Sequence, residues 1–140
     1  MVFYKGLWDE SRTVLVDDPR YTYNLVTVVG NRLAYNRQDV DGGNQRLCVR
    51  DLDESDPFDI ELLVWNEETQ EWKDADGLFP EWDPLSGGSR LFYHSNREGY
   101  LRVYALDLPT GIETVLSPEG VTAFYPAAYI DRRNQRHLYR

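Results

Sequence analysis

The fold of this 140-residue chain is decided by the stretch from Gly87 to Leu108, which reads GGSRLFYHSNREGYLRVYALDL. Two runs rich in Leu, Val, Phe and Tyr lie within it, near residues 90–94 and 100–107, and the turn-forming residues 96–99 separate them. Short apolar runs bounded by Gly, Asn and Ser are typical of antiparallel β-strands. We therefore expect a pair of adjacent strands here.

The start of this stretch recurs twice in the chain. The three copies are Arg-Leu-Ala-Tyr at 32–35, Arg-Leu-Phe-Tyr at 90–93 and Arg-His-Leu-Tyr at 136–139, and their arginines are 58 and 46 residues apart. After the first two copies, further apolar runs and turn residues follow in the same order, and no segment carries a sustained helical period. A pattern that recurs in this way indicates a repeated structural unit, and the chain is predicted to be all-β.

Each complete unit is predicted to hold four antiparallel strands, A to D in chain order. In the first unit they lie near residues 23–29, 32–37, 46–51 and 60–64, and in the second near 78–82, 90–94, 100–107 and 112–116. The two Arg patterns at 32 and 90 therefore begin the B strands. A polar insert over residues 65–77 connects the two units.

The two ends of the chain resemble halves of a further unit. Residues 2–7 and 13–15 match residues 103–108 and 114–116 at a constant offset of 101, which predicts strands C and D within residues 1–16. Strands A and B of a third unit are expected near 123–130 and 136–140. The chain is thus predicted to be a single domain divided into 1–16, 17–64, the insert 65–77, 78–117 and 118–140.

The second unit also resembles a known repeat. Its Trp82-Asp83-Pro84, the run from Gly87 to Gly99, and the run from Arg102 to Leu108 with Thr110-Gly111 after it are similar to the TolB-type propeller repeat, also called the WD40-like or PD40 repeat. The first and third units match it only in their B, C and D strands. The resemblance implies a β-propeller with three four-stranded blades per chain, and it implies little about function, because such blades occur in enzymes, transport components and scaffolds.

A three-bladed arc leaves its two terminal faces uncovered, whereas closed propellers typically have four to eight blades. The expected assembly is therefore a head-to-tail homodimer with six blades, in which the carboxy-terminal A and B strands of one chain complete the amino-terminal C and D strands of the other. Two alternatives stay open at this point. The chain is a piece of a longer propeller, or its two ends pair within one chain.

Composition limits the partners and the compartment. With 24 acidic and 15 basic residues, a net charge of −9 and a pI near 4.6, the chain is not expected to bind nucleic acid. The sequence contains no long apolar run and no recognisable leader, so neither a membrane span nor a secretory signal is predicted. The single cysteine, Cys48, lies between apolar strand residues and is expected to be a buried thiol of a cytoplasmic protein.

Several residues are candidates for a binding face formed by the B–C turns and the D–A connections. Asp39, Asp41 and Asn44 offer oxygen ligands in a glycine-containing turn, which suits calcium, although a plain hairpin turn is the competing interpretation. Trp65 and Trp72 in the acidic insert are expected over the same face, either as a platform for a sugar or a peptide or packed on the blade edge.

His94 and Arg97, at the end of the second B strand and in the turn after it, complete this candidate face. Ser95 and Asp107 are within sequence range of His94, but strand geometry does not force a catalytic triad on them. Arg32, Arg90 and Arg136 hold equivalent positions and are predicted to pair with an Asp or a backbone carbonyl of a neighbouring blade. The expected function is a non-catalytic binding or scaffold protein with a protein or carbohydrate ligand, and the alternative is a propeller lyase or hydrolase with a site at the central channel.

Overall fold

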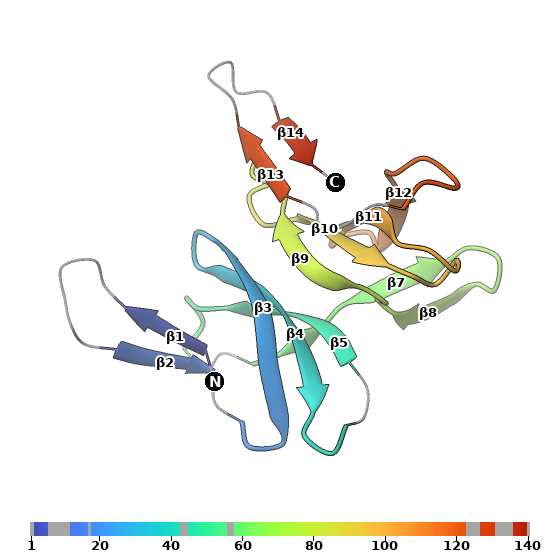
Figure 1. Cartoon of the computed structure of the whole chain (residues 1–140). Coiled ribbons are helices and arrows are strands. Elements are labelled where there is room, and N and C mark those ends of the chain that lie inside the picture. The colour runs from blue at the N-terminus through green and yellow to red at the C-terminus, as the bar shows by residue number, and fades with distance from the viewer. Residues whose placement is uncertain are drawn as a thin grey trace.

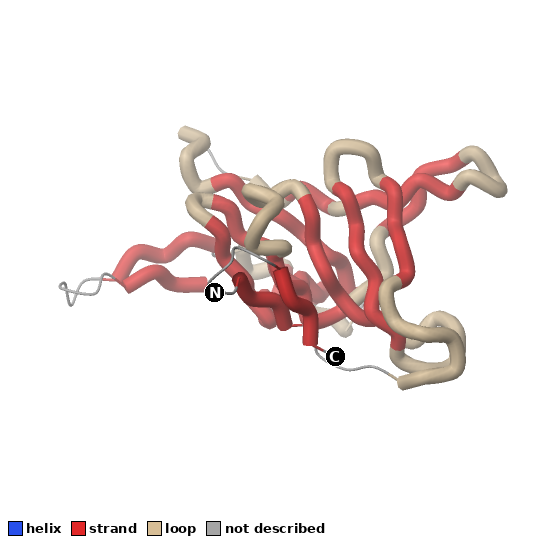
Figure 2. The backbone as a smooth tube through the Cα atoms, turned by 90° about the horizontal axis from the view of Figure 1, so that it is seen from above, coloured by secondary structure: helices blue, strands red, loops and turns tan. Residues whose placement is uncertain are grey.

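The computed structural model describes residues 2–5, 12–16, 18–42, 45–55, 58–122, 127–130 and 136–139. Within these ranges the chain forms fourteen strands, β1 to β14, and no helix. Figure 2 shows strands connected by turns throughout the described part. The prediction of an all-β chain is confirmed.

Two four-stranded antiparallel sheets form the body of the molecule (Figure 1). Sheet I contains, in spatial order, β3 (Tyr21–Val29), β4 (Arg32–Asp39), β5 (Gln45–Asp51) and β6 (Ile60–Glu61). Sheet II contains β9 (Leu78–Trp82), β10 (Arg90–Ser95), β11 (Arg102–Asp107) and β12 (Ile112–Val115) in the equivalent order. In both sheets the strands are neighbours in space as they are in sequence, as predicted for the two complete units.

The end of the first unit differs from the prediction. The strand expected near 60–64 stops at Glu61, and Leu63–Asn66 (β7) pairs with Glu71–Asp74 (β8) in a separate hairpin. The supposed insert 65–77 therefore holds part of a β-hairpin. Its turn is local, because Asn66 Oδ1 accepts hydrogen bonds from the backbone N–H groups of Glu68 and Thr69 at 3.0 and 3.3 Å.

The core lies between the facing surfaces of the two sheets. Sheet II presents its Leu91, Tyr93, Tyr104 and Leu106 side chains to Ala34, Leu47 and Val49 of sheet I, and all of these residues are buried. Asn36 of β4 adds a polar link, since its Nδ2 donates to Gly77 O at 2.9 Å and its Oδ1 accepts from Phe79 N at 3.2 Å. The first strands of the units also meet, because β9 contacts both β3 and β13 (Ala127–Ile130).

Backbone hydrogen bonds show that the two sheets are structural copies. Leu52 N donates to Asn31 O at 2.7 Å in sheet I, and at the equivalent place Leu108 N donates to Ser89 O at 2.8 Å in sheet II. The predicted role of Arg32 is confirmed, because its guanidinium binds Gly88 O of the next unit at 2.6 Å and Asp51 of its own sheet at 2.6 Å. The Arg90 guanidinium lies over the Phe92 ring of its own strand, 5.7 Å from the ring centroid, and its predicted pairing with a neighbouring unit stays a prediction. The side chain of Arg136 lies outside the described residues.

A tyrosine bound to a carboxylate also repeats in the two sheets. Tyr35 donates its hydroxyl to Asp59, just before β6, and Tyr93 donates its hydroxyl to Glu113 in β12. Burial raises the pKa of both tyrosines, so both remain protonated donors. An arginine reinforces each pair: Arg50 Nη2 lies 2.8 Å from Asp59 Oδ1, and Arg97 Nη2 lies 2.8 Å from Glu113 Oε2.

Two further hairpins come from the ends of the chain. Val2–Lys5 (β1) pairs with Arg12–Val16 (β2), and β13 pairs with Arg136–Tyr139 (β14). Each forms a two-stranded sheet of its own, and Figure 1 shows the two hairpins apart. Pairing of the two ends with each other is therefore absent from the described part of this chain.

The Asp59 carboxylate makes a stability test possible. Burial acts to raise its pKa, but hydrogen bonds from Tyr35, Arg50 and Arg37 outweigh burial and hold the pKa below its ordinary value. Asp59→Asn leaves the largely buried guanidinium groups of Arg37 and Arg50 without this anion and is expected to lower the free energy of unfolding at pH 7 by about 3 kcal/mol in urea titration. Glu54→Gln, at an exposed position in the same connection, is the control.

The difference between wild type and Asp59→Asn should shrink as the pH falls below about 4, where the unfolded-state carboxyl of the wild type takes up its proton. An Asp59→Asn protein as stable as wild type at pH 7 contradicts this account of sheet I.

Candidate functional site

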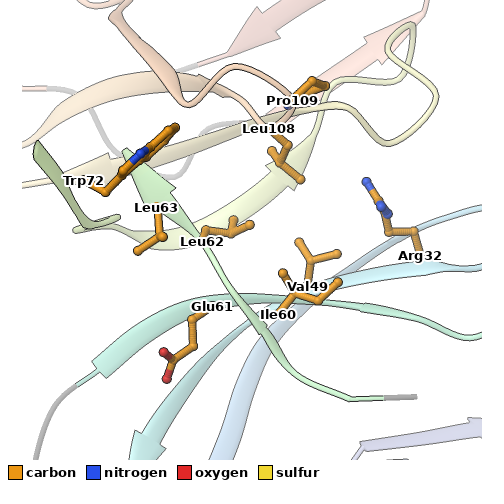
Figure 3. A pocket seen from close by; sticks show the side chains of 9 residues that line it. All are labelled: Arg32, Val49, Ile60, Glu61, Leu62, Leu63, Trp72, Leu108 and Pro109. Atoms are coloured by element: carbon orange, nitrogen blue, oxygen red, sulfur yellow. The ribbon is translucent and has the colours of Figure 1, made fainter. Parts of the chain in front are cut away.

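An apolar cleft opens between the outer parts of the two sheets, with a volume of about 420 Å³. Its lining comes from sheet I, from the β7–β8 hairpin and from the turn after β11: Val49, Ile60, Leu62, Leu63, Trp72, Leu108 and Pro109, with Arg32 and Glu61. Figure 3 shows Val49, Ile60 and Leu108 around the open space, while the carboxylate of Glu61 points away from it. Most of the surface offered to a ligand is therefore hydrocarbon.

The two charged residues of the cleft already have partners. Arg32 is held by Asp51 and by Gly88 O, and Glu61 accepts a salt bridge from Arg37 and another from Arg46 Nε at 3.4 Å. A ligand in the cleft must break these ion pairs in order to use the charges. Apolar contacts are the interactions that the cleft can make with a ligand without breaking an ion pair.

Trp72 forms one wall of the cleft and remains 54% exposed. Its ring meets Trp65, its cross-strand neighbour in the β7–β8 hairpin, edge to face with 5.2 Å between the ring centroids. Trp65 N–H of the backbone donates to Gly111 O at 2.9 Å, and its indole Nε1 donates to Glu67 at 2.7 Å. Trp65 is fixed in this way, whereas much of the Trp72 indole is free for contact with a ligand.

The position of the tryptophan pair corrects an expectation. Both residues were expected over the B–C turns, on one face with residues 39–45 and 94–99. They lie instead at the turn that contains Pro109 and Gly111, which connects β11 to β12 and so is at the opposite end of sheet II from the β10–β11 turn. The reason is the β7–β8 hairpin, which sequence analysis did not predict and which carries the indoles to the outer edge of β12.

The proposed calcium ligands are only partly described. Asp39 ends β4, and Asp41 is exposed in the following turn, where Gly42 N donates to Asp39 O at 3.0 Å. Asn44 lies outside the described residues. Among the residues that the structure describes, no three His, Cys, Asp or Glu side chains gather into a possible metal site. Calcium at this turn stays a prediction.

His94 and Arg97 occupy structural positions and not an open ligand face. His94 is 3% exposed, packs edge to face on Phe79 with 4.8 Å between ring centroids, and has its pKa lowered by burial. Arg97 binds Glu113 and lies over the Tyr104 ring at 4.0 Å. Both residues were expected in or near a turn, but the strand β10 extends to Ser95, and the Arg97 side chain folds back onto sheet II.

Most of the residues that line the cleft were not predicted from the sequence as site residues. The sequence identified four of them only as strand or turn residues, namely Val49, Ile60, Leu62 and Leu108. The cleft forms only when two sheets lie side by side, and local sequence patterns do not show that arrangement. A usable signal was the acidic stretch around Trp65 and Trp72, two aromatic residues seven positions apart that pair across β7 and β8. Cys48 is buried as predicted, and burial raises the pKa of its thiol to about 12.

Neither a scan against models of known protein families nor a search of curated proteins finds a match to this chain. Within the described ranges, no helix has the length and apolar character needed to cross a membrane.

The packing of Trp72 can be tested at Gly111. A Cβ at this position, where φ is +75°, would lie 2.2 Å from Cζ3 of Trp72, so Gly111→Ala must displace the indole. We expect a shift in tryptophan fluorescence and loss of protection of Trp72 from a water-soluble quencher. Gly99→Ala is the matched control, because its φ is +89° and a Cβ there meets nothing within 4 Å.

Both variants carry the strain of an alanine in the left-handed region, so any difference between them reports the contact with Trp72. Identical spectra and quenching in the two variants would show that Trp72 does not pack on this turn.

Proposed function

We propose that this chain is a non-catalytic binding protein with the architecture of a TolB-like β-propeller, and that it binds an apolar segment of a protein partner in the cleft beside Trp72. The observation that carries the proposal is a half-exposed indole at the mouth of a hydrocarbon-lined cleft whose charged groups are already paired. Exposed aromatic residues next to apolar hollows are common anchors in protein recognition.

The propeller part of the proposal is supported by the repetition of structure. Sheets I and II have the same strand order and equivalent hydrogen bonds, and they pack face to face. The first strands β3, β9 and β13 lie in contact in sequence order, as the inner strands of successive blades do around a central axis. The resemblance of residues 82–111 to TolB-type repeats agrees with this reading.

A protein ligand fits the cleft better than a carbohydrate does. Sugar recognition requires polar groups free to bind hydroxyls, in addition to an aromatic platform. The polar side chains lining the cleft are Arg32 and Glu61, and both are engaged. An Ile, Leu or Phe side chain instead finds an apolar surface of suitable size.

The enzyme alternative remains a prediction without an observation in its favour. His94 is packed on Phe79 and not in an open channel.

A cytoplasmic location remains part of the proposal and is supported by the buried, unpaired Cys48 thiol. The net charge of −9 argues against a nucleic-acid partner.

The binding site can be tested with small probes in an NMR titration of the ¹⁵N-labelled protein. N-acetyl-phenylalanine amide stands for an apolar peptide segment, and methyl β-glucoside stands for a sugar. We expect the amide to shift the indole N–H signal of Trp72 with a dissociation constant of order 1 mM, which corresponds to about −4 kcal/mol. Trp72→Ala should abolish saturable binding, whereas Leu85→Ala, which truncates another exposed apolar residue, should leave it unchanged.

A response to the glucoside alone would contradict the choice of ligand class. A response to neither probe, or one that survives in Trp72→Ala, would contradict the proposed site.

A further inference from the structure

The hairpins at the two ends of the chain have the backbone register of complementary halves of a sheet. In β1–β2, Phe3 pairs with Val14 and Tyr4 with Thr13. In strands C and D of sheet II, Tyr104 pairs with Val115 and Ala105 with Thr114. Both pairs match at the offset of 101 found in the sequence, so β1–β2 is built as a C–D pair.

The carboxy-terminal hairpin is the other half. Arg136, which begins β14, is the counterpart of Arg32 and Arg90, which begin the B strands β4 and β10. Its hairpin partner β13 contacts β9 as β9 contacts β3. In sheets I and II, strand B pairs with strand A on one side and strand C on the other, whereas in the described part of the chain β14 pairs with β13 alone and β1 with β2 alone.

We propose that two copies of this chain associate head to tail, with β14 of each copy forming an antiparallel ladder with β1 of its partner. The inference rests on the propeller architecture proposed above and does not depend on the ligand of the cleft. Pairing of exposed strand edges supplies backbone hydrogen bonds along the whole junction.

The β10–β11 ladder fixes the register of this junction. In sheet II, Phe92 pairs with Ala105 and Tyr93 with Tyr104. Transfer of these pairs to the equivalent positions places Leu138 opposite Tyr4 of the partner subunit and Tyr139 opposite Phe3 of the partner subunit. A shift by one residue would turn every side chain to the opposite face of the sheet.

The free face of sheet II is shaped to receive such a completed sheet. Arg32, Val49 and Ile60 line the cleft between sheets I and II, which Leu108 and Pro109 of sheet II close. On the free face, the equivalent residues Arg90, Ala105 and Thr114 line a hollow of about 320 Å³, and every residue that lines it belongs to sheet II or its turn. Ile112 at its edge is 57% exposed.

The free face of sheet I lacks its cover at the inner strand. Val28 pairs with Leu33 as Trp82 pairs with Leu91. Trp82 is 3% exposed because sheet I covers it, whereas Val28 is 58% exposed and Val26 beside it is also exposed. A sheet that contained the partner's β13 and β14 would cover this position, as sheet I covers Trp82.

A second copy is the occupant that the observations favour, because this chain itself carries both halves of the missing sheet. Two copies of these 140 residues hold the strands of six four-stranded sheets, a number within the four to eight blades of closed propellers. Two identical junctions then close the ring with two-fold symmetry and leave neither hairpin edge unpaired.

Light scattering and disulfide trapping test the junction. We expect twice the chain mass of 16.4 kDa for the wild type at micromolar concentration. Oxidation of the double variants Tyr4→Cys with Leu138→Cys, and Phe3→Cys with Tyr139→Cys, should give a covalent dimer in at least one case, since adjacent antiparallel pairs alternate between close and wide spacing. Tyr4→Cys with Tyr139→Cys is the off-register control and should not cross-link. The wild type controls for Cys48, which is buried.

The proposal would be overturned if the wild type were a monomer or an open chain of higher mass. It would also be overturned by a disulfide within one chain, by cross-linking only in the off-register control, or by a dimer that neither in-register pair traps. A mixture of protein carrying Tyr4→Cys alone with protein carrying Leu138→Cys alone should also yield a covalent dimer. Failure here leaves the peptide-probe titration at Trp72 unaffected, so the proposed dimer and the proposed ligand of the cleft are tested separately.

Discussion

The rest of the structure depends on the apolar layer between sheets I and II. A four-stranded sheet of this repeat has two faces rich in Leu, Val and Tyr, and each buried side chain of this size contributes about 2 kcal/mol only when another sheet covers it. Leu91, Tyr93 and Leu106 are covered by sheet I. The same packing requirement leaves sheet I and sheet II each with one further face to cover. In the dimer proposed above, sheets that contain the end hairpins cover these faces.

Arg32, at the start of the B strand β4, connects this packing to the cleft. Arg32 crosses from sheet I to Gly88 O of the next unit and keeps its charge neutralised by Asp51. Beyond this contact the cleft lies between the outer parts of the two sheets, and Leu63 and Trp72 of the β7–β8 hairpin line it. The apolar cleft proposed above as a binding site thus lies at the junction of two repeats, and Trp72 of the β7–β8 hairpin is the residue that is specific to this junction.

The sequence was sufficient to predict the strands that repeat and insufficient to predict those that do not. The B and C strands were found because Arg32 and Arg90 begin matching runs, and the register of β1–β2 follows the offset of 101. The β7–β8 hairpin was not predicted, because its strands contain polar residues such as Glu71 and Asp74 and because its sequence is not repeated in the second unit. The burial of His94 and the recruitment of Arg97 by Glu113 depend on contacts between distant segments, which local patterns do not encode.

Hydrogen exchange at the edges of the end hairpins tests the central claim most directly. The backbone N–H groups of β14 that do not donate to β13, and those of β1 that do not donate to β2, should exchange as slowly as the amides inside the β10–β11 ladder, because the account places each edge against a partner strand. The outward amides of β8, which pairs with β7 alone among the described strands, serve as the freely exchanging reference. Exchange of the β14 and β1 edges at the rate of the β8 reference would contradict the account.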